Sequence, residues 1–592
     1  KAAGWDKVGG VYFFTKMFGC QPHPYTELYL DNMKISDKPA TGWKGLIAEL
    51  PNTGKDKFPV VYSAIEWQKD QINHKYPETT DNKAVYTPYA YQYYFRNERD
   101  LFKYYPKFVP GYVSFDQHGK AYVNSGEIIQ FKGDDGKWHI SEPGKAAIAW
   151  AKKQGWKGIN IGWTLNKSEK AIRFDRDGDA YVLLQIEGLN EQGKPFSWKT
   201  RHTLLLHSND KMKSWQVYKL PGRMAEFEKL DGHNEECLDR PPVILTCGIS
   251  YFGGSVQGGY MTLPEKQKDG TLKLPPQIKY ANHCIGVNQH SGGGNRAVTK
   301  NGKIYIIYSW YVAQRLRKGD WKKDCPPIPS DHPGLKLKYI RKSHQTTTEY
   351  SKNGVPAFVV AYDLKTKKLS KPAFVGMGGG VYDNHNWGAI TVDGKGYLHV
   401  VINGHHNPTA YSRTVKPLDI SKWTAPEYVL PKGQKNQPNL SYATLNCDKQ
   451  NNLYTAHRST TGAYNNHIGL YRMTPEGKWQ PEQTLIIPFK YMYKVWGNKI
   501  MYNPATDKMC LSLYGQSSMK QLSRDQYEFD IFYWPDHEKV YYSNTYNQGL
   551  NRGPAPPNGR CNMMLSEPSE IISLMSTGPG KEWKLVTSED LR

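Results

Sequence analysis

Short runs that alternate apolar and polar residues dominate this chain, and they come in pairs around a polar turn. Each pair consists of a strand-like run, a turn rich in Asp, Asn or Gly, and a second run that begins with an aromatic or aliphatic residue, which is the pattern of a β-hairpin. Sustained helical periodicity is scarce, and the best helix candidate is Gly144 to Trp156. The pattern therefore predicts an all-β protein. Six such hairpins occur: "VSFDQHGKAYV" from Val113, "IRFDRDGDAYVLL" from Ile172, "RAVTKNGKIYIIYSW" from Arg296, "AITVDGKGYLHVVI" from Ala389, "ATLNCDKQNNLYTAH" from Ala443 and "IMYNPATDKMCLSLY" from Ile500.

The turns recur at intervals typical of propeller blades. Asp116 and Asp175 are 59 positions apart, and Asp393, Asp448 and Asn503 follow one another at intervals of 55. Repeats of this length, each with a central hairpin and looser outer strands, are typical of β-propellers. The segments before Val113 and after Asp530 could supply a seventh blade closed by both termini. We predict a seven-bladed β-propeller, with a β-sandwich enzyme carrying appended domains as the alternative.

The repeat also suggests how the chain is divided. Residues 1–105 match it poorly and are rich in Tyr and Pro, so we expect an N-terminal strand and decoration that pack on the propeller. Residues 106–592 are expected to form the propeller as a single catalytic domain. Two stretches rich in Pro, Lys and Gly, about 220–281 and 313–357, are interpreted as insertions between blades, because long loops often form the walls of a site.

Composition and charge narrow the classes of partner. The 592 residues are 13% aromatic, which excludes a disordered chain, and carry a formal net charge of +23, which favours anionic partners, although a solvated basic surface would give the same count. The sequence has no zinc-finger spacing, no helix-turn-helix and no aromatic signature for binding single-stranded nucleic acid. Nucleic acid is therefore not expected as a partner. No apolar run is long enough for a membrane-spanning helix. We expect a monomer that is secreted, periplasmic or at the cell surface, its signal peptide already removed.

The eight cysteines do not decide the redox compartment. They are too widely spaced for a small disulfide scaffold. Cys237 and Cys247 could close a short loop, but free buried thiols explain them equally well.

Candidate chemistry lies at the open ends of two neighbouring hairpins, opposite their turns. His385 lies eight residues before the turn Asp393–Gly396, and His405 lies nine residues after it. In the next repeat Tyr442 and Arg458 lie six residues before and seven after the turn. Antiparallel strands return both residues of each pair to the same end. A single His or Tyr at a strand end is more often structural, but four such groups converging predict a functional site.

This combination of groups suits proton removal next to a carboxylate. Imidazole and phenol can exchange protons with a substrate, and a guanidinium can hold and neutralise a carboxylate. Neutralisation makes the adjacent C–H more acidic, and a second group donates a proton to the leaving glycosidic oxygen. The predicted reaction is β-elimination from a uronic acid, and the basic charge fits an anionic substrate, for which we expect a sulfated uronate-containing polysaccharide.

At these residues the chain resembles the BNR-repeat seven-bladed propellers that include polysaccharide lyases acting on ulvan. The matching stretches are "DNHNWGAITVDGKGYLHVVINGHHNP" and "YATLNCDKQNNLYTAHRS". The resemblance implies that His385 and Tyr442 serve as base and acid, and that Arg458 and a second histidine bind the uronate carboxylate. The second histidine is His406 by the G-x-H pattern or His405 by hairpin symmetry.

Further candidates are weaker. Substrate contacts are expected near the same end of the molecule, although Tyr493 and Trp496 could equally belong to the core and the glycines after His290 could simply form a turn. Catalysis is expected to need no cofactor. Relatives of this kind can hold a structural metal ion, zinc or calcium. The substrate-contact candidates are Asn288, His290, Arg296, Asn384, Trp387, Tyr493 and Trp496, and the metal candidates are His283, Cys284, Cys447 and Cys510.

Two other functions fit the same fold. A glycoside hydrolase of the rhamnosidase kind usually needs a pair of carboxylates, and only Asp383 is near the predicted site. A non-catalytic glycan-binding propeller would need only Arg and aromatic residues. Replacing His385 or Tyr442 would abolish turnover in an enzyme but only weaken binding in such a protein.

Overall fold

A computed structural model of the chain describes residues 112–586 with internal gaps, and from residue 516 onward it describes only strands. The predicted N-terminal decoration, residues 1–105, lies outside this part. The gaps before residue 516 are 125–128, 136–137, 161–170, 190–201, 222–223, 248–254, 286–294, 313–318, 321, 336–353, 380–384, 403–404, 406–407, 433–439, 460–466 and 489–494.

The described strands group into seven antiparallel sheets of four or more strands, numbered here in chain order. The first sheet is followed by helix α4 (Pro143–Lys153), close to the range predicted for a helix. The first sheet is β1 (Tyr112–Phe115), β2 (Ala121–Asn124), β3 (Ile129–Lys132) and β4 (Trp138–Ser141). The second is β5 (Lys157–Asn160), β6 (Arg173–Phe174), β7 (Ala180–Leu189), β8 (His202–Ser208) and β9 (Gln216–Lys219). The third is β10 (Met224–Phe227), β11 (Ile244–Cys247), β12 (Ser255–Thr262) and β15 (Ile278–Ile285).

The remaining four sheets follow the same antiparallel plan. The fourth is β16 (Ala297–Lys300), β17 (Lys303–Ser309), β18 (Val355–Asp363), β19 (Lys368–Leu369) and β20 (Ala373–Gly378). The fifth is β21 (Gly388–Val392), β22 (Leu398–Ile402), β23 (Ala410–Lys416), β24 (Asp419–Trp423) and β25 (Glu427–Tyr428). The sixth is β26 (Leu440–Ser441), β27 (Asn446–Cys447), β28 (Leu453–Ser459), β29 (His467–Met473), β30 (Gln483–Pro488), β35 (Ile531–Trp534) and β36 (Lys539–Tyr542). The seventh is β31 (Val495–Asn503), β32 (Lys508–Gly515), β37 (Arg560–Met564), β38 (Ile571–Ser576) and β39 (Trp583–Val586).

Short elements lie outside these sheets. They are the hairpins β13 (Glu265–Lys266) with β14 (Leu272–Lys273) and β33 (Lys520–Ser523) with β34 (Gln526–Glu528), and the 3-10 helices η5 (Glu235–Leu238) and η7 (Pro333–Leu335). Among the described residues, no helix has both the length and the apolarity needed to cross a membrane. The predicted all-β class is confirmed.

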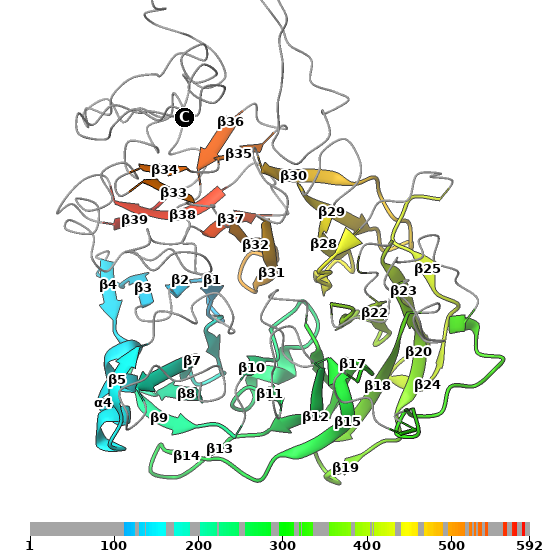
Figure 1. Cartoon of the computed structure of the whole chain (residues 1–592), viewed down its shortest axis with the longest axis horizontal. Helices are drawn as coiled ribbons and strands as arrows, with labels where there is room; N and C mark the ends of the chain where they lie inside the picture. The colour runs from blue at the N-terminus through cyan, green and yellow to red at the C-terminus, as the bar shows by residue number, and fades with distance from the viewer. Residues whose placement is uncertain are drawn as a thin grey trace, which may run out of the picture.

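The sheets stand around a common centre in the order of the chain, from the blue β1 round to the orange β31 (Figure 1). Strands β1 and β31 contact each other, so the first and seventh sheets are neighbours and the ring is closed. Apolar side chains fill the space between adjacent sheets; between the fourth and fifth, for example, Ile307 and Val359 pack with Ile390 and Val400. This arrangement is that of a β-propeller.

One sheet, the third, comes from an unexpected part of the chain, whereas all six predicted hairpins are present. They are β1–β2, β6–β7, β16–β17, β21–β22, β27–β28 and β31–β32. Strands β10, β11 and β12 and the first half of β15 fall in the stretch expected to be an insertion, about 220–281, but together they form the third sheet. The 313–357 stretch lies inside the fourth sheet, since β17 and β18 pair directly on either side of it. With residues 1–111 outside the described part, the number of blades stays a prediction.

One local motif builds the turns of four hairpins. An Asp at position i accepts hydrogen bonds through Oδ1 from the backbone N–H groups of residues i+2 and i+4, and its Oδ2 contacts the side chain at i+6. This local bonding explains why the turns were visible in the sequence. The pairs are Asp116 with Tyr122, Asp175 with Tyr181, Asp393 with His399 and Asp448 with Tyr454.

A segment between β10 and β11 ties the turn ends of several sheets together. Asp231 is fully buried; its Oδ1 accepts from the backbone N–H groups of Gly232 (2.9 Å) and Cys447 (2.8 Å), and its Oδ2 accepts from the Thr391 hydroxyl. The third, fifth and sixth sheets therefore meet at one carboxyl group. Burial raises the pKa of Asp231 to about 7.

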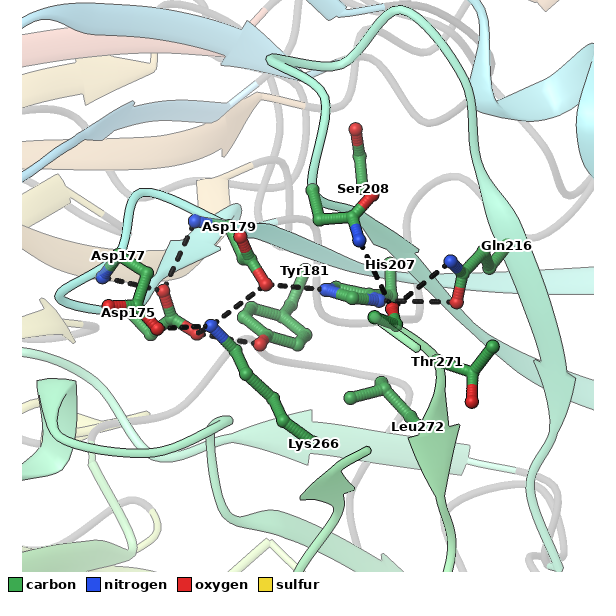
Figure 2. A network of polar contacts seen from close by, with 12 residues as sticks. Asp175, Asp177, Asp179, Tyr181, His207, Ser208, Gln216, Lys266, Thr271 and Leu272 are labelled. Atoms are coloured by element: carbon green, nitrogen blue, oxygen red, sulfur yellow. Dashed lines mark hydrogen bonds and ion pairs between the residues drawn. The ribbon is translucent and has the colours of Figure 1, made fainter. Parts of the chain in front are cut away.

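The β13–β14 hairpin is fastened to the second sheet by an ion cluster (Figure 2). Lys266 Nζ lies 2.7 Å from carboxylate oxygens of Asp175 and Asp177 and 2.8 Å from one of Asp179. Asp179 also contacts buried His207 at 2.9 Å. These three carboxylates raise the pKa of Lys266, although partial burial opposes them. The hairpin thus bridges the second and third sheets.

Candidate active site

The fifth sheet brings two histidines together at the open end of its first hairpin, as predicted. Gly388 of β21 pairs with Ile402 of β22, and His385 and His405 lie three residues beyond this pair on either strand. Their ring centroids are 4.4 Å apart. His385 is half-buried, whereas His405 is buried. His385 is therefore the imidazole with better access to solvent.

Asn386 fixes the two sides of this open end to each other. Its side-chain Oδ1 accepts a hydrogen bond from the backbone N–H of His405 at 2.8 Å. Gly379 passes so close that a Cβ there would come within 2.2 Å of the same oxygen, and its φ of +70° also favours glycine. This buried contact holds the two imidazoles at their spacing, and nothing in the sequence pattern points to Asn386.

Tyr442 is placed by an irregularity in the sixth sheet. Ser441 pairs with Arg458 and Asn446 pairs with Tyr454, so four residues on the first strand, 442–445, oppose three on the second. One extra residue in a strand is a β-bulge, which redirects side chains. Tyr442 itself has φ of +66°, an unfavourable backbone conformation for a bulky residue. The surrounding packing therefore holds Tyr442 in a strained position.

The Tyr442 ring lies between both histidines and two further side chains. Its centroid is 6.2 Å from the rings of His385 and of His405. Trp387 stacks on it at 5.3 Å with an interplanar angle of 14°, and the Arg458 guanidinium carbon lies 4.3 Å from its centroid. The four residues predicted to converge, His385, His405, Tyr442 and Arg458, are thus brought together.

Arg458 differs from expectation in what it touches. Its side chain is 0% exposed, and its guanidinium faces the Tyr442 ring. A direct grip on a substrate carboxylate, which the resemblance implied, does not fit this burial. Arg458 is placed instead to act on Tyr442, because a cation over an aromatic face attracts its electrons.

Neighbouring His457 adds no charge to this end of β28. It is fully buried, with Nε2 2.9 Å from the Thr455 hydroxyl oxygen, and burial lowers its pKa to about 3. Near neutral pH the imidazole is therefore uncharged. Arg458 is the charged member of the pair.

Two predicted substrate contacts are buried behind the site. Trp387 is 1% exposed and Arg296 is 6% exposed. The Arg296 guanidinium carbon lies 5.9 Å from the Trp387 ring centroid, and its Nε forms an ion pair with Glu226 Oε1 at 3.2 Å. Both side chains therefore support Tyr442 from within, and their burial argues against the direct substrate contact predicted for them.

Other predicted positions are only partly described. Trp496 and Cys510 lie on β31 and β32, but their side chains are not described. Of the two candidates for the second histidine, His405 and His406, the structure describes His405. Asn288, His290, Asn384, His406 and Tyr493 lie outside the described residues.

The predicted metal set is not brought together where it is described. His283 and Cys284 are consecutive on β15, while Cys447 lies on β27 in a different core cluster. His283 is 3.4 Å from Asp324, and Cys284 is buried in the core. Within the described ranges, no group of three or more His, Cys, Asp or Glu side chains could hold a metal ion. Cys237, offered as a possible disulfide partner, is a free buried thiol.

Residues 341–488 match the model of a BNR repeat-containing family member. This segment contains all four residues of the site, and it confirms the predicted resemblance to BNR-repeat proteins there. A curated relative, the ulvan lyase of Alteromonas sp. (strain LOR), is 28% identical in an alignment of 120 residues that covers 17% of this chain and 25% of that protein. The chain thus matches a quarter of that relative's length.

Three solved structures are similar to this chain at low sequence identity and low TM-score. A protein of unknown function from Dyadobacter fermentans DSM 18053 is 12% identical, covers 61% of this chain and 93% of its own, and has a TM-score of 0.33. A PL25 ulvan lyase bound to -[GlcA(1-4)Rha3S]- is 12% identical over 50% of this chain and 70% of its own, with a TM-score of 0.28. The α-L-arabinanase of Penicillium chrysogenum is 12% identical over 58% and 87%, with a TM-score of 0.32.

Proposed function

We propose that this protein is a polysaccharide lyase that cleaves a uronate-containing polysaccharide by β-elimination. The observation that carries the proposal is the cluster of His385, His405 and Tyr442, whose rings lie within 4.4–6.2 Å of one another with Arg458 over the Tyr442 ring. The cluster holds three groups able to exchange protons. The match to an ulvan lyase over 120 residues supports a substrate of that class.

The reaction needs one base, one acid and positive charge near the carboxylate. The base takes the proton from C5 of the uronate, the C5–H electrons form a C4=C5 double bond, and the C4–O bond breaks. The acid gives its proton to the leaving oxygen, so the products are an unsaturated uronate and a free hydroxyl group. His385 and Tyr442 divide the base and acid roles.

The remaining two residues support the base and the acid. His405 is buried and packs against His385 with ring centroids 4.4 Å apart, so it holds that imidazole in position beside the substrate. Arg458 stabilises negative charge on the Tyr442 oxygen when the phenol gives up its proton, acting through the ring face. A formal charge of +23 attracts the polyanionic chain to the protein. Such substrates lie outside cells, so we place the protein in a secreted or cell-surface location.

The test is ultraviolet absorbance of the conjugated C4=C5 bond while the protein is mixed with a panel of uronate polysaccharides, including ulvan. We expect absorbance to rise with at least one of them and not with Tyr442→Phe. New reducing ends without absorbance would replace the proposal with a hydrolase. Tight binding without either signal would replace it with a glycan-binding propeller.

A further inference from the structure

We infer that Arg296, held by its counter-ion Glu226, is a positioning residue that fixes Tyr442 through Trp387. The inference rests on the proposed function for its kinetic consequences. Its structural content, that this ion pair keeps the Trp387–Tyr442 pair in place, stands independently of which reaction the site performs.

An unbroken series of contacts joins these side chains. Glu226 Oε1 and Arg296 Nε are 3.2 Å apart, and Arg296 Nη1 donates to the Ile285 carbonyl oxygen at 3.2 Å. The Arg296 guanidinium lies over the Trp387 ring at 5.9 Å, and Trp387 stacks on Tyr442 at 5.3 Å. Arg458 contacts Tyr442 in turn. The Glu226–Arg296 contact is an ion pair that keeps the guanidinium charge in place, while the cation–π and stacking contacts favour defined orientations of the rings.

The series crosses four sheets of the ring. Glu226 lies on β10 of the third sheet, Arg296 precedes β16 of the fourth, Trp387 precedes β21 of the fifth, and Tyr442 follows β26 of the sixth. Tyr442 has an unfavourable φ of +66°, so its position must be imposed by neighbours. The strand that carries Tyr442 does not by itself favour this conformation. Contacts from the neighbouring sheets therefore help to hold Tyr442 in place.

Burial separates positioning from substrate binding. The side chains of Arg296 and Glu226 are 5% and 12% exposed, and Trp387 is 1% exposed. A group that never meets substrate affects how well the catalytic groups are aligned, and a misplacement of about 1 Å can lower turnover about 100-fold. Loss of this support should therefore lower kcat and leave KM nearly unchanged.

The test compares Trp387→Phe, Arg296→Lys and the double variant Glu226→Gln with Arg296→Gln, which removes both charges and leaves no buried ion unpaired. Arg413→Gln is the matched control, because Arg413 lies 4.7 Å over the Tyr397 ring on the fifth sheet, away from the site. Thermal unfolding checks that every variant is folded, and near-ultraviolet circular dichroism reports on the Trp387–Tyr442 pair.

We expect the double variant to lose the circular dichroism band that Trp387→Phe also removes, and to lower kcat about 10- to 100-fold with KM within about twofold. The kcat of Arg296→Lys should lie between those of the double variant and the wild type, since a lysine keeps the charge but not the planar guanidinium group. A raised KM at unchanged kcat, or an unaltered band, would overturn the inference. If no polysaccharide is cleaved, the proposed function fails. The circular dichroism band of the double variant would still show whether the ion pair holds Trp387 and Tyr442 in place.

Discussion

The two ends of the fifth and sixth sheets differ in how closely they follow the repeat. At the turn end, Asp393 and Asp448 accept the same pair of backbone hydrogen bonds, and a His or Tyr six residues later contacts each carboxylate. At the open end, a bulge and a residue with φ of +66° interrupt the ladder. The repeated end stabilises the fold, and the irregular end gathers the groups that can move protons.

This contrast separates two kinds of variant. Changes at the open end should alter turnover and leave the free energy of unfolding nearly unchanged. Changes at the turn end should do the reverse, because their groups lie across the molecule from the histidines. Four substitutions test the separation, beginning with the one expected to have the largest effect.

Replacing His385 by Asn should lower kcat about 10²- to 10⁴-fold, the contribution typical of a general acid or base. The side chain is half-buried at the open end of the hairpin, so the urea midpoint should stay within error. His118→Asn, in the exposed turn of the first hairpin, is the control and should retain activity. Equal loss of activity in both variants would contradict the separation.

Asp231→Asn should change how stability depends on pH. The folded pKa of about 7 lies above the ordinary value of 3.8, so the unfolded chain loses this proton first as pH rises. Wild-type stability should therefore fall between about pH 4 and 7, by on the order of 1–4 kcal/mol from this group, and level off above. The asparagine variant cannot ionise and should lack this fall.

The measurement is urea unfolding of both proteins at pH 5 and pH 8, with the wild type losing more stability than the variant. A wild-type-minus-variant difference that does not change with pH would show that the carboxyl group does not titrate in this range.

Asp448→Ala should lower the free energy of unfolding by about 1–3 kcal/mol, because it leaves two backbone N–H groups and the Tyr454 hydroxyl without their acceptor. Turnover per folded molecule should be unchanged. Asp363→Ala, at an exposed turn where the carboxylate accepts from the Thr366 N–H, is the control and should cost less. Chemical denaturation measures the free energy of unfolding of both variants. An equal loss in the two would mean that the buried turn at Asp448 stabilises the fold no more than the exposed turn at Asp363 does.

Lys266→Met should have the smallest effect, about 1 kcal/mol of lost stability, since the ion cluster is partly exposed and screened by solvent. Three carboxylates would then face one another without their shared ammonium group (Figure 2). The loss should shrink as salt is added. Lys273→Met on the same hairpin, whose Nζ is 4.0 Å from Glu265, should change the thermal midpoint less. A larger loss from Lys273→Met would exclude the cluster as the fastening point.

The sequence allowed the regular end to be predicted because its signals are local. Asp393 and its partner backbone groups lie within five residues, and counting from that turn placed His385 and His405 at the same open end. The third sheet escaped the same reasoning because residues 228–243 replace its tight turn with a long excursion. The Asp231-Gly232 pair lies within this excursion and so does not mark a short turn between two strands.

The supporting residues could not be predicted because they depend on distant packing. The bulge at Tyr442 appears only in its register with β28, and the burial of Arg458 and Arg296 follows from how neighbouring sheets meet. In the sequence, Asn386 does not differ from other polar residues beside a histidine. Its role follows from its contact with the His405 backbone, which depends on the fold. Spacing therefore located the clustered histidines and Tyr442, while the residues packed around them required the fold.

The most direct test of this account pairs two tyrosines of the sixth sheet. Tyr442→Phe removes a hydroxyl group at the open end, and Tyr454→Phe removes the one that donates to Asp448 at 3.1 Å at the turn end. Rates of formation of unsaturated uronate and urea midpoints would be measured for both. We expect Tyr442→Phe to abolish the rate at unchanged stability, and Tyr454→Phe to lower stability at unchanged rate. An active Tyr442→Phe protein would contradict the account.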